Sequence, residues 1–189
     1  MKVFVCGSAD KNINPKYIEG VDKIAENLNA HNDGIICVGT SVGAVGAIYK
    51  KVIEGDGFVD IIVPTAYANE AEGMIANSIT QVDTLFMLQQ VALRNSRVTL
   101  VLPGGNGTLA ELYMITDSIK SKFDTDLVII YNINGYYDKL KEMNQFMINA
   151  GTMKGFQNNF FKWCDTPEEV VDELDKWRDK IANEKTKFN

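Results

Sequence analysis

The 189-residue sequence has few of the residues on which several kinds of catalytic and metal sites depend. His31 is the only histidine and lies in a turn-like segment, so nothing supports a Ser-His-Asp or Cys-His device. The three cysteines, Cys6, Cys37 and Cys164, are widely spaced and form neither a CxxC pair nor a Cys/His cluster. We therefore expect no metal site and no metal cofactor, and we interpret the cysteines as buried, reduced thiols of a cytoplasmic protein.

Long hydrophobic runs and excess positive charge are also missing. No apolar run approaches the roughly 18 residues that span a bilayer, and the apolar start is broken too soon at Gly7 to be a signal peptide. The chain has 25 acidic and 19 basic side chains, a formal charge of −6, whereas a duplex-binding domain normally has a basic surface. We expect a cytoplasmic protein whose main partner is neither a membrane nor a nucleic acid.

Short apolar runs typical of buried strands alternate with segments of helical periodicity along the chain. The strand-like runs are 3–6, 34–38, 58–63, 79–83, 98–102, 127–131 and 160–163, and the helix-like segments begin near residues 15, 41, 85, 108, 138 and 166. This alternation predicts an α/β fold with a doubly wound, mainly parallel sheet and helices on both faces. We expect one domain over residues 1–183 and a polar tail over residues 184–189. In such sheets ligands bind at the carboxyl ends of the strands.

The strongest local pattern is the glycine loop, residues 102–111, with the sequence Leu-Pro-Gly-Gly-Asn-Gly-Thr-Leu-Ala-Glu. Glycines permit positive φ and close approach of a ligand, and the free N–H groups of a following helix suit phosphate. The candidate binding residues are Gly104, Gly105, Asn106, Gly107 and Thr108. Glu111 lies one turn further, at the edge of that site. However, Thr108-x-x-Glu111 is also a capping box, in which Glu111 would only bond to the cap N–H.

Two other strand ends carry small residues. Gly7 and Ser8 follow the first run, and Gly39 and Ser41 follow the second, so all three loops are expected to form one phosphate-binding pocket. The alternative for residues 43–46 is that two glycines only let a helix pack closely on the sheet. A dinucleotide site is weakly supported, because no acidic residue ends the strand after the glycine loop, and the loop has no Walker A lysine.

These residues resemble the LONELY GUY (LOG) family, whose proteins are often labelled lysine decarboxylases. The family motif PGGxGTxxE matches residues 103–111 at every fixed position, and similar segments recur along nearly the whole chain. The resemblance implies a Rossmann-like, nucleotide-binding fold, a homodimer, and hydrolysis of a nucleoside 5′-monophosphate such as AMP to free base and ribose 5-phosphate without a cofactor. It also implies that Glu111 is the catalytic carboxylate and that the loop holds the phosphoribosyl group.

The chain departs from the family where an Arg-Lys pair precedes the motif strand, because Leu88 and Gln89 occupy those positions. Arg94 lies about 240° further round the helix and does not replace the arginine simply. Asp117 stands where the family has a substrate-contacting threonine.

Two functions therefore stay open. Glu111 favours a nucleotide N-glycosidase with altered base preference, and the missing pair favours a binding module that holds a phosphorylated ligand as sensor or carrier. We take the enzyme as the working hypothesis and expect a homodimer with its interface in residues 77–95.

Overall fold

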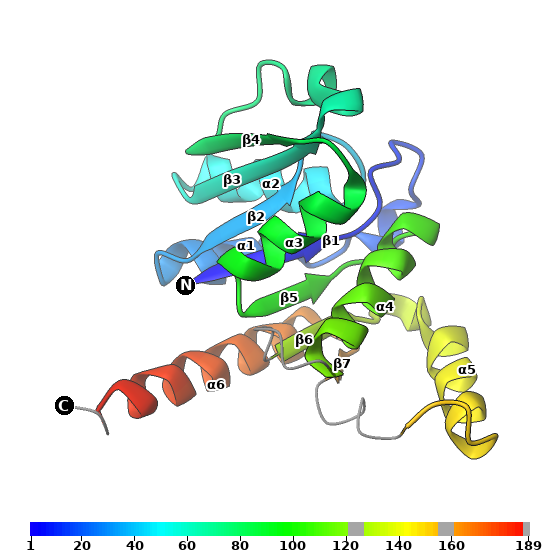
Figure 1. Ribbon diagram of the computed structural model, residues 1–189. Coiled ribbons are helices and arrows are strands. Elements are labelled where there is room, and N and C mark those ends of the chain that lie inside the picture. The colour runs from blue at the N-terminus through cyan, green and yellow to red at the C-terminus, as the bar shows by residue number, and fades with distance from the viewer. Residues whose placement is uncertain (121–126, 155–160, 187–189) are drawn as a thin grey trace.

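The computed structural model describes residues 1–120, 127–154 and 161–186, and these residues contain a seven-stranded sheet in which every pairing is parallel (Figure 1). The strands are β1 (Lys2–Cys6), β2 (Gly34–Val38), β3 (Phe58–Pro64), β4 (Ser78–Val82), β5 (Val98–Val101), β6 (Leu127–Tyr131) and β7 (Phe161–Cys164). Their order in the sheet is β4-β3-β2-β1-β5-β6-β7. The expected α/β fold with a parallel sheet is confirmed.

Helices cover both faces of the sheet. They are α1 (Val21–Ala30), α2 (Gly43–Glu54), α3 (Leu85–Asn95), α4 (Asn106–Lys120), α5 (Asp138–Asn149) and α6 (Pro167–Thr186), with short 3-10 turns η1 (Pro15–Tyr17), η2 (Thr65–Ala71) and η3 (Ile133–Gly135). Buried residues of α1, α2 and α6 pack on one face, and those of α3 and α4 pack on the other. Within the described ranges, no helix is long and apolar enough to cross a membrane.

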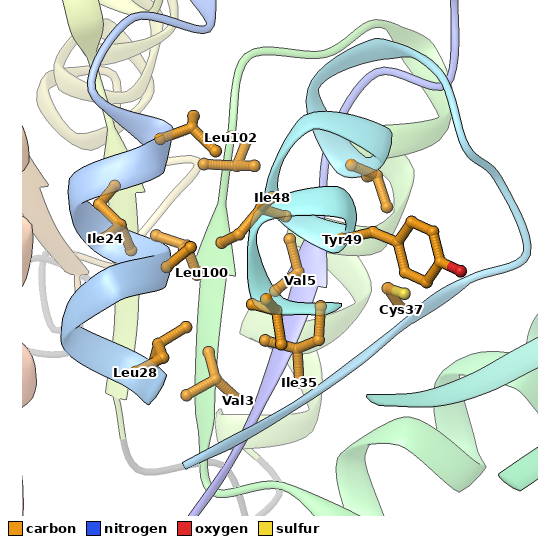
Figure 2. Close-up of a cluster of buried hydrophobic side chains, with 14 of the residues drawn as sticks. Val3, Val5, Ile24, Leu28, Ile35, Cys37, Ile48, Tyr49, Leu100 and Leu102 are labelled. Carbon is orange, nitrogen blue, oxygen red and sulfur yellow. The ribbon is translucent and has the colours of Figure 1, made fainter. Parts of the chain in front are cut away.

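The core on the first face joins residues that are distant in sequence. Figure 2 shows Ile24 and Leu28 of α1 and Ile48 of α2 lying against Val3, Val5 and other strand residues of the sheet. Strands β1, β2 and β6 are buried along nearly their whole length because helices cover both sides of them, whereas the edge strand β4 is mostly exposed. This explains why the buried strands were readable as continuous apolar runs rather than as alternating patterns.

The strand order determines where along the sheet a ligand crevice can form. From β1 the chain builds outward to β4 on one side and then crosses to β5, which pairs with the other side of β1. The carboxyl ends of β1 and β5 therefore flank the topological switch point, where open α/β sheets leave a crevice for ligands. Gly7 and Ser8 leave the end of β1, and the glycine loop leaves the end of β5.

The first helix begins later than residue 15, the predicted start. Asn14 accepts a hydrogen bond from Lys16 N, but it caps only the 3-10 turn η1. Gly20 then adopts a left-handed φ of 72°, and α1 starts at Val21. A Cβ at Gly20 would lie 2.6 Å from Pro167 Cγ, so the break is also fixed by a residue far along the chain.

The last helix begins near residue 166 as predicted, has a side-chain cap, and ends later than the expected start of the polar tail. Thr166 accepts from Glu169 N at 3.3 Å, and the Glu169 side chain accepts from Asp165 N at 2.6 Å. Helix α6 continues to Thr186, so residues 184–186 of the expected polar tail are helical. Residue 160, expected in the last strand, lies outside the described residues.

Candidate functional site

A cavity of about 340 Å³ lies at the switch point, where the loops after β1 and β5 meet. Its lining residues are Val5, Cys6, Gly7, Ser8, Ala9, Asp10, Val38, Gly105, Gly107, Thr108 and Glu111. Six of these were candidates from the sequence: Gly7, Ser8, Gly105, Gly107, Thr108 and Glu111. The fold thus brings together residues that are about 100 positions apart in the chain.

Helix α4 begins at Asn106, two residues before the predicted cap. Its first intrahelical bond runs from Leu109 N to Gly105 O at 3.0 Å, which makes Gly105 the residue before the helix and places Thr108 in its first turn. The capping-box interpretation is therefore wrong, because Thr108 lies in the first turn of the helix and not at its N-cap position. Glu111 lies on the second turn and is not needed to close the helix end.

The first-turn N–H groups of α4 have no acceptor in the helix. Asn106, Gly107 and Thr108 precede the first residue whose N–H finds a carbonyl four residues back. Asn106 itself is exposed and does not line the cavity, whereas Gly107 and Thr108 do. The positive end of the helix dipole adds to these donors, so this side of the cavity suits an anionic group.

The glycines of the loop provide space rather than an unusual backbone conformation. A Cβ at Gly104 would lie 2.1 Å from Thr108 Oγ1 and 2.8 Å from Ser8 N, while a Cβ at Gly105 or Gly107 would meet nothing within 4 Å. None of the three has a positive φ, which corrects that part of the prediction. Gly104 lets the loop fold against Thr108, and the other two leave the cavity open beside the backbone.

Glu111 and Cys6 are two ionisable groups of this cavity whose pKa values are strongly shifted. Burial raises the pKa of its carboxyl from 4.5 to about 7, and a hydrogen bond from the Cys6 thiol opposes that rise. Burial, followed by the negative charge of Glu111, raises the pKa of Cys6 well above its ordinary value, so this thiol keeps its proton and donates. At neutral pH the Glu111 carboxyl therefore exchanges readily between its two protonation states.

The loop after β1 is tied directly to the glycine loop. Ser8 N donates to Pro103 O at 2.9 Å, and a Cβ at Gly7 would lie 3.0 Å from Leu102 Cβ. The Ser8 hydroxyl accepts from Asp10 N at 3.1 Å, which holds a tight turn at the cavity edge. Gly7 therefore permits the close approach of the two loops, and Ser8 faces the cavity that they enclose.

The loop after β2 does not reach this cavity in the way that the sequence suggested. Gly39 is buried, with a would-be Cβ 2.8 Å from Ala71 Cβ, and Ser41 is exposed and lines a separate depression beside α1 and α2. Gly43 has a φ of 73° and would place a Cβ 2.2 Å from Ser8 O. Val45 N donates to the same carbonyl at 3.2 Å, so the start of α2 is packed against the β1 loop. The packing interpretation of these glycines agrees with the geometry.

No basic residue lines the cavity in the described part of the chain. Leu88 and Gln89 of α3 are 1% and 6% exposed, and the buried Gln89 Oε1 has no partner among the described residues. Arg94 lines a groove at the opposite, amino-terminal edge of the sheet. Asp117 is exposed on α4. The described residues also contain no group of three or more His, Cys, Asp or Glu able to hold a metal.

Five lining residues were not singled out as site residues by the sequence: Val5, Cys6, Ala9, Asp10 and Val38. Cys6 was interpreted only as a buried thiol. Asp10 is exposed at the cavity, and its Oδ1 accepts from Asn12 N at 2.8 Å. Its position directly after the Gly7-Ser8 turn was the available signal, because small-residue turns at strand ends put the next polar side chain at the crevice.

Solved structures confirm the fold type. The molybdenum cofactor carrier protein of Chlamydomonas reinhardtii matches 93% of this chain and 96% of its own, with a TM-score of 0.66 and 12% identity. The molybdenum cofactor binding protein of Rippkaea orientalis matches 93% of this chain and 94% of its own, with a TM-score of 0.67 and 15% identity. At these identities the likeness extends to the Rossmann-like fold.

Curated relatives share more sequence. The chain is 25% identical over 162 residues to the probable cytokinin riboside 5′-monophosphate phosphoribohydrolase LOGL2 of Oryza sativa subsp. japonica. The matched region covers 85% of this chain and 66% of that protein, just under two thirds of its length. The chain is 23% identical over 185 residues to the cytokinin riboside 5′-monophosphate phosphoribohydrolase LOG1 of Arabidopsis thaliana, covering 96% of this chain and 86% of that protein. The family model described as "Possible lysine decarboxylase" matches residues 45–174, so the chain belongs to that family, which is the LOG family expected from the glycine loop.

Proposed function

We propose that this protein is a nucleoside 5′-monophosphate phosphoribohydrolase, which cleaves the N-glycosidic bond to release a free base and ribose 5-phosphate. The observation that carries the proposal is Glu111, a partly buried carboxyl with its pKa raised to about 7, in a cavity that also contains the free amides of α4. The curated relatives named above hydrolyse or are named for hydrolysing a ligand of this class.

The phosphate would bind at the start of α4. Unpaired N–H groups of the first turn, the helix dipole and the Thr108 hydroxyl all favour an anion there. Glu111 lies three residues beyond Thr108, a rise of about 4.5 Å along the helix. That offset puts the carboxyl beyond the phosphate, on the side where the ribose would extend into the cavity.

Cleavage of an N-glycosidic bond develops positive charge on the sugar. The Glu111 carboxylate would stabilise this oxocarbenium-like state and orient the attacking water. The thiol of Cys6 donates to that carboxyl and would hold its orientation. The Asp10 carboxylate at the cavity edge would accept a hydrogen bond from a ribose hydroxyl.

We also propose a homodimer whose interface includes the start of α3. Leu85, Phe86 and Met87 are 60%, 54% and 40% exposed, whereas Leu88 on the same helix is buried. Three consecutive exposed apolar side chains at a helix start favour burial against a second copy.

The second candidate function is binding without turnover. It is favoured by one specific observation, which is that none of the described residues that line the cavity is basic. The family positions for the Arg-Lys pair are Leu88 and Gln89, which are buried against the sheet and cannot supply a cation to the ligand. In that case the cavity would hold a nucleotide or a related phosphorylated ligand as a sensor or carrier.

Free-base release from a panel of nucleoside monophosphates tests the proposal. We expect the wild type to release base from at least one monophosphate, and Glu111→Gln to bind it with similar affinity while hydrolysis falls about 100-fold or more. AMP at ~100 times its dissociation constant should stabilise the fold by about 2.7 kcal/mol, and adenosine much less. Binding without base release by the wild type would favour the second candidate. Wild-type rates in Glu111→Gln would refute the role of the carboxylate.

A further inference from the structure

Two adjacent tyrosines hold the glycine loop from outside the cavity. The Tyr136 hydroxyl donates to Gly104 O at 2.9 Å, and the Tyr137 hydroxyl donates to Leu102 O at 2.7 Å. Both tyrosines follow η3, the turn after β6, and neither lines the cavity. The carbonyls of the loop are thus fixed by an element that never touches the ligand space.

The bond from Tyr136 also determines the direction of an amide. The C=O of Gly104 and the N–H of Gly105 belong to one peptide group, and the described chain has no cis peptide. In a trans peptide these two groups point in opposite directions. A carbonyl held toward Tyr136 therefore turns the Gly105 N–H away from Tyr136, and Gly105 is itself a lining residue of the cavity.

The Gly105 amide is available to a ligand. It is the residue before α4, so its N–H has no place in the helical hydrogen-bond ladder, and no acceptor for it occurs among the described residues. It is continuous with the free amides of the first turn. Together they form a row of donors at one wall of the cavity.

The bond from Tyr137 has no such consequence. The Leu102 carbonyl shares its peptide group with the nitrogen of Pro103, which carries no hydrogen. Tyr137 is 3% exposed and braces the loop from the core. Its hydroxyl also hydrogen-bonds to the backbone of Gly104, which does not line the cavity. The chain thus offers two phenol–carbonyl bonds to one loop, and only one of them is linked to an amide at the cavity.

Tyr136 is itself held in place by its neighbours. Its ring packs edge-on against Tyr17 and Tyr137, with centroid distances of 4.7 Å and 4.8 Å. Burial raises its pKa, so the phenol stays protonated and remains a donor. The Asn134 side chain donates to Lys16 O at 2.8 Å, which ties η3 to η1 and so keeps Tyr136 beside Tyr17.

We propose that Tyr136 is a positioning residue, whose hydroxyl fixes the Gly104–Gly105 peptide so that the Gly105 N–H donates to the phosphate of the ligand. This inference rests on the proposed function in one respect, which is that the ligand carries a phosphate. It does not require that the ligand be hydrolysed.

The test compares Tyr136→Phe with Tyr137→Phe. Each change deletes one hydroxyl and keeps the ring, and Tyr136→Phe keeps the contact with Tyr17. AMP and adenosine affinities are measured by titration calorimetry, and the Gly105 amide is followed in the free protein by ¹⁵N NMR. For Tyr136→Phe we expect AMP binding about tenfold weaker, unchanged adenosine binding and a shifted Gly105 amide signal. For Tyr137→Phe we expect lower stability but wild-type affinity for AMP.

Three results of the variant comparison would count against Tyr136. Wild-type AMP affinity in Tyr136→Phe, or equal losses in both variants, would show that the hydroxyl only stabilises the loop. An unshifted Gly105 signal would show that it does not orient that peptide. If the wild type binds AMP but releases no base, the hydrolase proposal fails while this comparison still decides the role of Tyr136. If the wild type binds no monophosphate, both proposals fall.

Discussion

Replacing Glu111 with glutamine is expected to stabilise the protein at neutral and alkaline pH. The carboxyl has an ordinary pKa of 4.5 and a pKa of about 7 in the folded chain, because burial disfavours its charged form. Above pH 7 the folded protein must therefore keep a charge that the unfolded chain carries at no cost. Gln has nearly the same shape and no charge, so the variant avoids this cost.

The sign and size follow from linkage between protonation and folding. Below pH 4.5 Glu111 is protonated in both states and adds no penalty, and the penalty grows as pH rises from 4.5 through about 7. That interval, at about 1.36 kcal/mol for each pH unit, corresponds to about 3 kcal/mol. Since Glu111 is partly reached by solvent, we expect between about 1 and 3 kcal/mol, or roughly 3 to 10 °C in melting temperature.

Urea denaturation of the wild type and Glu111→Gln at pH 4.5, 6, 7 and 8 measures this difference. The two proteins should converge at the lowest pH, and the variant should gain stability progressively above it. The exposed Glu72 provides the control: Glu72→Gln removes one carboxylate and should change stability by less than about 0.5 kcal/mol throughout. A variant that is less stable than the wild type at pH 8, or a difference that does not vary with pH, would refute the reasoning.

Base release should rise about tenfold per pH unit up to about pH 7 and then level off, because the Glu111 carboxylate is the active form; a flat profile between pH 5.5 and 8.5 would contradict that role. Gly104→Ala should cost about 1–3 kcal/mol in denaturation experiments, since its Cβ would meet Thr108 Oγ1 at 2.1 Å. Gly105→Ala should fold like the wild type but bind AMP more than tenfold less well, because its methyl group would enter the cavity; the reverse ranking would show that the loop has been misinterpreted. Light scattering at micromolar concentration should show a dimer that Phe86→Glu dissociates, and a monomeric wild type would contradict the proposed interface.

Much of the fold could be predicted from local sequence. The inner strands are buried on both sides and appear as short apolar runs, and β2 and β6 have the predicted bounds Gly34–Val38 and Leu127–Tyr131. Helix α3, Leu85–Asn95, also begins where it was predicted, with Thr84 accepting from Met87 N as its cap. The glycine loop was predicted because three glycines at a strand end exceed what a plain turn needs. All of these signals arise from residues close together in the chain.

Only the tertiary structure decided where α1 and α4 begin and which of the candidate residues reach the cavity. Thr108 and Glu111 have the spacing of a capping box. Only the observed start of α4 at Asn106 shows that Thr108 is not the cap and leaves Glu111 available to the cavity. Gly39 and Ser41 follow a strand end as Gly7 and Ser8 do, yet the packing of α2 on the Ser8 carbonyl keeps them off the cavity.

The properties of the site itself are also set by distant contacts. The pKa of Glu111 depends on how deeply the fold buries it beside Cys6, which is 105 positions earlier in the numbering of the sequence. The direction of the loop amides depends on a hydroxyl from the turn after β6. The sequence determined most of the strands, the glycine loop and the family, because these depend on residues close together in the chain. Burial, helix starts and amide directions required the structure, because each depends on residues that only folding brings together.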